Sequence, residues 1–180
     1  MGGLISAGAA SSNATRVERP PYLVLDTNVW MDFYLQERTG HEVASELLKA
    51  AARHGAELLY PVHSSKDVYF IIAADAKRRS IRKFGAEHAE EAAKAADAFA
   101  WGCIDYMSRQ ATAVPCDHTD IWLAEKQRGL HSDFEDDLVI AAAMRAKADL
   151  LVTNDDKLLR HSPIPTLGAS DAIAWLDSRE

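Results

Sequence analysis

Four acidic residues occupy positions at which an α/β protein places its chemistry. Asp26 follows the apolar run Tyr-Leu-Val-Leu, Asp155 follows Leu-Leu-Val-Thr, and Asp67 lies beyond Leu-Leu-Tyr-Pro-Val. In parallel sheets such positions gather at the carboxyl ends of the strands, where ligands usually bind. Asp136, in the first turn of another predicted helix, is placed to join them. Long stretches separate the four acids in the sequence, so only the tertiary fold can bring them together.

A crevice holding several carboxylates favours a bound cation. Negative charges close together repel one another, and a cation offsets this repulsion. The predicted ligands are oxygen atoms, without cysteine or histidine, and such a set favours Mg²⁺ or Mn²⁺ over Zn²⁺. An ion of this kind polarises a phosphoryl oxygen, lowers the pKa of a water molecule and helps to orient an in-line attack. The acids therefore predict metal-dependent phosphoryl chemistry.

Each acid also has a purely structural interpretation, which stays open at this point. Asp26 and Asp155 are suited to capping helices, and Asp67, in the first turn of a predicted helix, interacts favourably with the helix dipole. The neighbouring acids are interpreted as solvated or capping residues: Asp133, Glu135, Asp137 and Asp156.

The elements that must position the acids are short apolar runs alternating with longer helical patterns. Strands are expected within 22–25, 58–62, 111–115, 150–153 and 164–167. This alternation is typical of a three-layer α/β/α sandwich with a central parallel sheet. Residues 1–20 are small and polar and are expected to form a flexible N-terminal tail, while residues 21–180 form one domain.

Polar residues mark the starts of several expected helices. Ser64 and Ser65 are suited to capping the helix that carries Asp67. Ser132 and Glu135 have the spacing of a capping box. Ser170 with its neighbour Asp171 is expected to cap the last helix, and 87–110 has the apolar stripe of a long amphipathic helix.

Composition and charge restrict the classes of partner. The 180 residues are 48% hydrophobic and carry a formal charge of -7, so a nucleic acid must be bound by a local basic patch. No stretch approaches the ~20 apolar residues of a membrane span, and we expect no membrane partner. Two cysteines are too few for a disulfide framework and are expected to be buried thiols in a reducing cytoplasm.

One basic run is the candidate nucleic-acid contact. Its alternative interpretation is an ordinary solvated helix face. The run comprises Lys77, Arg78, Arg79, Arg82 and Lys83. No GxGxxG motif follows a strand and GxxxxGK[ST] does not occur, so the sequence lacks the dinucleotide-binding and P-loop motifs.

Three segments resemble the PIN-domain ribonucleases of the bacterial toxin type, the VapC-like toxins of type II toxin–antitoxin systems. They are LDTNVWMDFYL at 25–35, SSKDVYFII at 64–72 and DFEDDLVIAAAMRAKADLLVTNDDKLL at 133–159. With the helices between them, the resemblance covers about residues 22–176 and implies a PIN-like fold for 21–180.

The resemblance also implies site residues. Asp26, Asp136 and Asp155 correspond to the first, third and fourth acids of the family, and are the expected metal ligands. The second acid is usually a glutamate. Here Asp67 takes that position as the fourth catalytic residue, with a side chain one methylene shorter. Helpers that orient the carboxylates would be Thr27, Asn28 and Thr153.

The activity implied by the resemblance is Mg²⁺- or Mn²⁺-dependent endoribonuclease activity. A water molecule would attack the phosphorus of an RNA phosphodiester and the 3′ oxygen would leave. The implied partners are RNA, a small antitoxin protein that covers the acidic crevice, and a second copy of the chain in a homodimer. Two alternatives remain: a non-catalytic PIN-like domain that binds RNA or protein, and a metal-dependent phosphatase.

Overall fold

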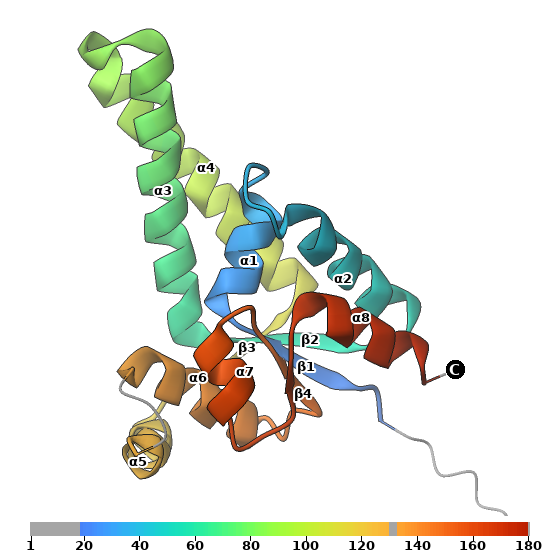
Figure 1. The fold of residues 1–180 in the computed structure, drawn as a ribbon. Coiled ribbons are helices and arrows are strands. Elements are labelled where there is room, and N and C mark those ends of the chain that lie inside the picture. The colour runs from blue at the N-terminus through green and yellow to red at the C-terminus, as the bar shows by residue number, and fades with distance from the viewer. Residues whose placement is uncertain (1–18, 130–132, 180) are drawn as a thin grey trace, which may run out of the picture.

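A parallel β-sheet forms the centre of the structure, a computed structural model that describes residues 19–129 and 133–179 (Figure 1). Five strands are present within these residues, in the order β3-β2-β1-β4-β5. They are β1 (Tyr22–Leu25), β2 (Glu57–Pro61), β3 (Thr112–Val114), β4 (Leu150–Val152) and β5 (Thr166–Leu167). The first strand is thus central, and every pair in the sheet is parallel, as predicted.

Side chains on both faces of the sheet are buried, which gives three layers. Leu23 and Leu25 of β1 belong to one apolar cluster, whereas Val24 belongs to the other. Successive side chains of a strand point to opposite faces, so two clusters require helices on both sides. The structure confirms the predicted α/β/α sandwich.

The helices divide between the two faces of the sheet. The first cluster takes side chains from α1 (Thr27–Tyr34), α2 (His41–Arg53), α3 (Val62–Phe84), α4 (Ala89–Gln110) and α8 (Ala169–Asp177). The second takes them from α6 (Phe134–Arg145) and α7 (Asp156–His161). Helix α5 (His118–Gln127) packs on α6.

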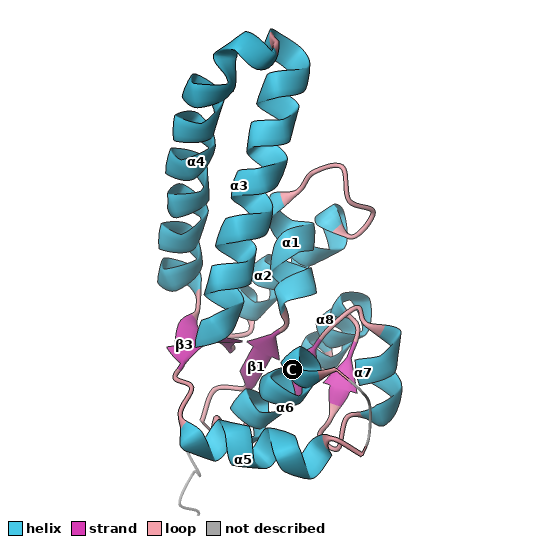
Figure 2. Cartoon of the chain, turned by 90° about the vertical axis from the view of Figure 1, so that its left-hand side faces the viewer, coloured by secondary structure: helices cyan, strands magenta, loops and turns pink. Residues whose placement is uncertain are grey.

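Helices α3 and α4 form a long hairpin that projects beyond the sheet (Figure 2). The basic run continues α3, and the helix ends at Gly85, whose φ of +99° is unfavourable for other residues. A single 3₁₀ turn, η1 (Ala86–His88), connects it to α4. The predicted helix 87–110 therefore matches α4 apart from its first two residues.

Three predicted helix starts differ from the structure. Helix α3 begins at Val62, directly after β2 ends at Pro61, so Ser64 and Ser65 lie inside the helix. Because no loop separates strand and helix, no serine cap is needed. Helix α6 is capped by Asp133, whose side chain accepts a hydrogen bond from the Glu135 N–H at 3.0 Å. Ser132 lies outside the described residues.

Helix α8 begins one residue before the predicted Ser170 cap. Its N-cap is Gly168, which supplies no side chain. The amide oxygen of Asn154 instead accepts a hydrogen bond from the Ala169 N–H at 3.4 Å. Asn154, in the β4–α7 loop, thus supplies the hydrogen bond that the sequence pattern assigned to Ser170.

Nothing among the described helices is long and apolar enough to cross a membrane. Most of the predicted tail, residues 1–18, lies outside the described residues.

Candidate functional site

Hydrogen-bond donors that follow strands β1 and β4 hold the carboxylate of Asp26. Asp26 follows β1, caps α1 and is 7% exposed. Its Oδ1 accepts a hydrogen bond from the Thr27 N–H at 2.6 Å. Its Oδ2 accepts from Asn28 Nδ2 at 2.6 Å and from the Thr153 hydroxyl at 2.7 Å. The pairing of Leu25 with Val152 explains this contact, because it sets the residues after β1 and β4 side by side.

The Thr153 hydroxyl connects two of the predicted ligands. While it donates to Asp26, it accepts hydrogen bonds from Asn28 Nδ2 at 2.9 Å and from the Asp155 N–H at 3.0 Å. Thr153 is fully buried, so these bonds are shielded from water. Asp26 and Asp155 are therefore anchored to one atom.

Asp155 also caps a helix. Its Oδ1 accepts hydrogen bonds from the N–H groups of Lys157 at 2.7 Å and Leu158 at 3.2 Å, at the start of α7. Asp155 is therefore a helix cap, as one interpretation of the sequence predicted, and both capping bonds use Oδ1. The residue is half-buried, and its N–H contacts Thr153.

Two acids of α6 act electrostatically on Asp26. Burial raises the pKa of Asp26 to about 6, hydrogen bonds from Thr153 and Thr27 oppose the rise, and the charges of Asp136 and Glu135 add to it. Asp136 is half-buried in the first turn of α6. A nearby like charge disfavours the ionised form of a carboxyl group. The pKa of Asp26 therefore responds to both acids of α6.

Glu135 interacts electrostatically with Asp67, the fourth predicted acid, as well as with Asp26. Burial, followed by the charge of Asp67, raises the pKa of Glu135. Asp67 lies in the second turn of α3, since the helix starts earlier than predicted, and forms an ion pair with Lys66 at 3.5 Å. Glu135 is thus coupled to Asp26 on one side and to Asp67 on the other.

Sequence reasoning interpreted Glu135 as a solvated or capping acid. Its place directly before Asp136, in the first turn of a helix that faces the sheet edge, was the available signal. Thr27 also acts differently from the implied role. Its backbone N–H, not its hydroxyl, supports Asp26, and its buried hydroxyl has no hydrogen-bond partner within the described part of the chain.

The donor set suits a hard divalent cation. The candidate metal ligands are all oxygen atoms. They belong to Asp26, Asp136 and Asp155, with the unpartnered Thr27 hydroxyl beside Asp26. Among residues 19–129 and 133–179, no three carboxylate, imidazole or thiol groups form a ready-made metal cluster. Mg²⁺ keeps several waters and takes only one or two carboxylates directly, so it fits such an arrangement.

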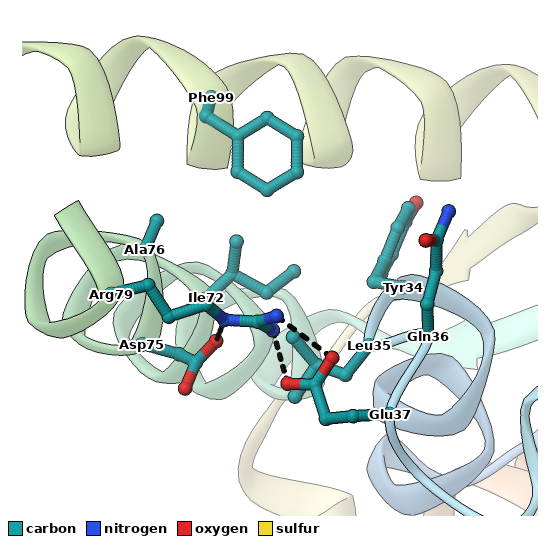
Figure 3. Close-up of a pocket in the computed structure, with 9 residues that line it drawn as sticks. All are labelled: Tyr34, Leu35, Gln36, Glu37, Ile72, Asp75, Ala76, Arg79 and Phe99. Atoms are coloured by element: carbon teal, nitrogen blue, oxygen red, sulfur yellow. Dashed lines mark hydrogen bonds and ion pairs between the residues drawn. The ribbon is translucent and has the colours of Figure 1, made fainter. Parts of the chain in front are cut away.

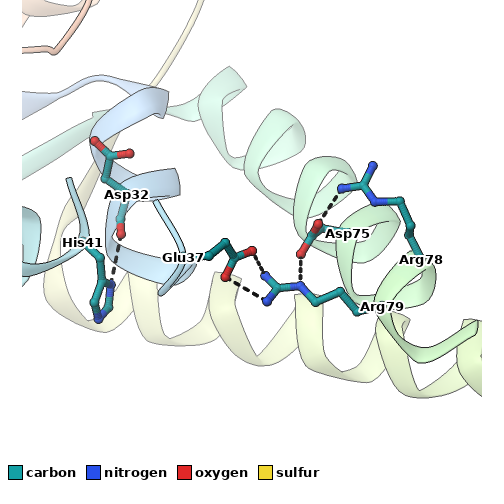
Figure 4. A network of polar contacts seen from close by, with 6 residues as sticks. All are labelled: Asp32, Glu37, His41, Asp75, Arg78 and Arg79. Atoms are coloured by element: carbon teal, nitrogen blue, oxygen red, sulfur yellow. Dashed lines mark hydrogen bonds and ion pairs between the residues drawn. The ribbon is translucent and has the colours of Figure 1, made fainter. Parts of the chain in front are cut away.

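The basic run lies on α3, towards the far end of the hairpin. Arg78 and Arg79 both donate to Asp75, and Arg79 also pairs with Glu37 (Figure 4). These two guanidinium groups are therefore held inside the protein's own ion pairs. The exposed members of the run that remain are Lys77, Arg82 and Lys83.

A cavity of about 400 Å³ lies between the end of α1 and the hairpin, separate from the acids (Figure 3). Leu35, Ile72 and Phe99 give it an apolar lining, and the pair of Arg79 and Glu37 lies at its edge. None of the four predicted acids lines this cavity. It is a separate surface feature.

Comparisons with known proteins agree with this geometry. A profile of the PIN domain family matches residues 22–157. No curated protein matches the sequence significantly. Among solved structures, the chain is similar to one in the crystal structure of VapBC2 from Rickettsia felis bound to a DNA fragment from their promoter. The TM-score is 0.58 at 13% identity, over 82% of this chain and 98% of that chain. At this identity the similarity concerns the fold.

Proposed function

The chain belongs to the PIN-domain family, and from that membership we propose that it is a divalent-metal-dependent endoribonuclease. The observation that carries the proposal is the shared Thr153 hydroxyl, which donates to the Asp26 carboxylate and accepts from the backbone N–H of Asp155. Asp136 acts on the same carboxylate from α6. Residues that are distant in the sequence thus contact one another at the ends of β1 and β4, which supports a site for phosphodiester hydrolysis at this edge of the sheet.

In the proposed mechanism, Asp26, Asp136 and Asp155 would hold the ion. When bound, Mg²⁺ or Mn²⁺ would neutralise the acids, polarise a phosphoryl oxygen and lower the pKa of a water molecule. Thr153 and Asn28 keep Oδ2 of Asp26 in a fixed orientation, which reduces reorganisation during the reaction. A neighbouring carboxylate, with Asp67 as the candidate, would accept the proton of the attacking water.

RNA would be bound through its phosphates by exposed cations of the hairpin. Lys77, Arg82 and Lys83 remain available, whereas Arg78 and Arg79 would first have to leave their ion pairs. Position 77 lies ten residues beyond Asp67 on the same helix, or roughly 15 Å along its axis. The run would therefore contact RNA several nucleotides from the cleaved bond.

The test is cleavage of a structured RNA with Mn²⁺, with and without EDTA. Wild type and the matched control Asp105→Asn, an exposed acid on α4, should cleave equally. Asp26→Asn and Asp136→Asn should lose at least about 100-fold in rate, because a metal-ligand change removes several kcal/mol of charge stabilisation. Equal cleavage by all four proteins would reject the active site. Cleavage of small phosphoesters but not RNA would favour a phosphatase.

A non-catalytic PIN-like binding domain is the second candidate. It is favoured by the lack of a ready-made three-ligand cluster among the described residues. Calorimetry with Mn²⁺ separates the two. The nuclease should release heat that disappears in Asp136→Asn, whereas a binding-only domain should give the same trace in both proteins.

We further propose that the chain is the toxin of a toxin–antitoxin pair in the cytoplasm. The similar Rickettsia structure is described as VapBC2 bound to promoter DNA, which supports an antitoxin partner. Free Cys103 and Cys116 are consistent with a reducing compartment. Co-expression with a short protein from the adjacent reading frame should yield a complex that no longer cleaves RNA. Failure to co-purify would count against this pairing.

A homodimer is the other proposed partner arrangement. Phe70 of α3 and Trp101 of α4 are 59% and 60% exposed on the hairpin and lie on either side of Tyr69, which contacts both rings. Exposed aromatic clusters of this kind commonly mark protein interfaces. Light scattering should give twice the mass of the chain for wild type, and the mass of one chain for Phe70→Glu. A monomeric wild type would refute the dimer.

A further inference from the structure

Asn154 stands between Thr153 and Asp155 and is held at three points. Its backbone N–H donates to Asn28 Oδ1 at 3.0 Å, and its Oδ1 accepts from the Ala169 N–H at 3.4 Å. The third contact is a hydrogen bond from Asn154 Nδ2 to Asp32 Oδ2 at 2.8 Å. The loop that carries Asp155 is therefore tied to α1 and to the start of α8.

Asp32 is a buried acid that the proposed mechanism does not use. It lies in α1, is 5% exposed, and has a donor on each carboxylate oxygen. Arg38 Nε donates to Oδ1, while Asn154 Nδ2 donates to Oδ2. Because both oxygens are engaged, the carboxylate is held in one orientation. It accepts the amide of Asn154 from that fixed position.

The surroundings of Asp32 keep that position fixed. Its backbone oxygen contacts His41 Nδ1 at 3.1 Å at the start of α2 (Figure 4). A Cβ atom at Gly40 would collide with the carboxylate of Asp32, so only glycine leaves room for it. A buried carboxylate carries a desolvation penalty that an apolar residue would avoid. Its presence here is explained if its oxygen is needed by Asn154.

We infer that Asp32 is a positioning residue, which acts through Asn154 to fix the loop that bears Thr153 and Asp155. The catalytic consequence rests on the proposed nuclease function, but the structural consequence does not. Loss of the Asp32 carboxylate frees the Asn154 amide, and the 153–155 segment then samples orientations in which the Thr153 hydroxyl no longer donates to Asp26. Residues that orient metal ligands in this way typically affect activity by 10–100-fold.

The test compares three variants with one matched control. Asp32→Ala and Asn154→Ala remove the two ends of the contact, whereas Asp32→Asn keeps an oxygen that accepts from Asn154. Asp120→Asn is the control. Asp120 is 1% exposed and, like Asp32, is held by one arginine and one N–H, but it lies on α5 away from the loop.

The first measurement is hydrogen exchange in metal-free protein, read for residues 153–155. We expect at least about 10-fold faster exchange in Asp32→Ala and Asn154→Ala, near wild-type exchange in Asp32→Asn, and no local change in Asp120→Asn. Unchanged exchange in Asn154→Ala, at an exposed position, would overturn the inference.

The second measurement is Mn²⁺-dependent RNA cleavage. In Asp32→Ala the kcat should fall about 10–100-fold with KM changed less than about 2-fold, and Asp32→Asn should restore most of the loss. An equal fall in kcat for Asp120→Asn would show a general stability effect and overturn the inference. If wild type cleaves no RNA, the proposed function fails, and the hydrogen exchange alone decides the role of Asp32.

Discussion

Replacing Thr153 by valine would test whether one buried hydroxyl organises the acidic edge of the sheet. Valine has nearly the same shape, so the packing around this fully buried position is preserved. The substitution removes the donor to Asp26 and the acceptor for Asn28 Nδ2 and the Asp155 N–H. Thr153→Ser is the matched control, because it keeps the hydroxyl and loses only a methyl group.

The expected free energies follow from these contacts. A hydrogen bond to a charged group contributes about 1.5–3 kcal/mol and a neutral one about 0.5–1.5 kcal/mol. Asp26 retains its bonds from Thr27 and Asn28. We therefore expect Thr153→Val to lower the free energy of unfolding by about 2–3 kcal/mol. Thr153→Ser should lower it by about 1 kcal/mol, the value of one buried methyl group.

The assay is urea unfolding in EDTA at about pH 7.5, where a slope of about 2 kcal/mol/M turns these losses into midpoint shifts of about 1–1.5 M and about 0.5 M. Thr153→Val should also lose the Mn²⁺-induced rise in melting temperature, while Thr153→Ser should retain it. If the serine variant is the less stable of the two, the methyl contact outweighs the hydrogen bonds, and the reasoning is refuted.

Three further outcomes are expected. In the folded protein the pKa of Asp26 is raised to about 6, so its carboxyl group binds a proton more tightly than in the unfolded chain. The free energy of unfolding in EDTA should therefore fall by at most about 3 kcal/mol as pH rises from about 4 to about 6. Urea titrations should show no such fall in Asp26→Asn. Iodoacetamide should label exposed Cys116 and spare Cys103 in the folded protein, because burial raises the pKa of the Cys103 thiol to about 11; peptide mass spectrometry showing Cys103 labelled first would contradict this. Arg145→Met should destabilise the fold by about 3 kcal/mol by stranding buried Asp120, and thermal unfolding should show partial recovery when Asp120→Asn is added; purely additive losses would rule out the pairing.

The sequence was sufficient to predict the sheet and the meeting of Asp26 with the end of β4. Apolar runs of the right length define parallel strands, and parallel pairing sets their carboxyl ends at one edge. The strand ends also explain why Thr153 contacts Asp26 although 127 residues separate them. These features depend on patterns that repeat along the backbone.

Features that depend on single side-chain contacts were not predictable. Asn154 reaches Asp32 across 122 residues of sequence and also caps α8, so local motifs pointed to Ser170 instead. The charge of Asp67 on α3 contributes to the raised pKa of Glu135, and a capping motif at the start of α6 does not predict this interaction between two helices. The ion pairs of Arg79 with Glu37 and Asp75 join α3 to the segment after α1, and the basic run alone does not predict them.

The central place of β1 in the sheet has a consequence for synthesis. The first strand to leave the ribosome must wait for β4 before its second edge is paired, and Thr153 arrives with that late strand. A nascent chain therefore carries Asp26 with Thr27 and Asn28 but without Thr153, the donor that comes from β4. The contact between Asp26 and Thr153 therefore cannot form before β4 has emerged and paired with β1.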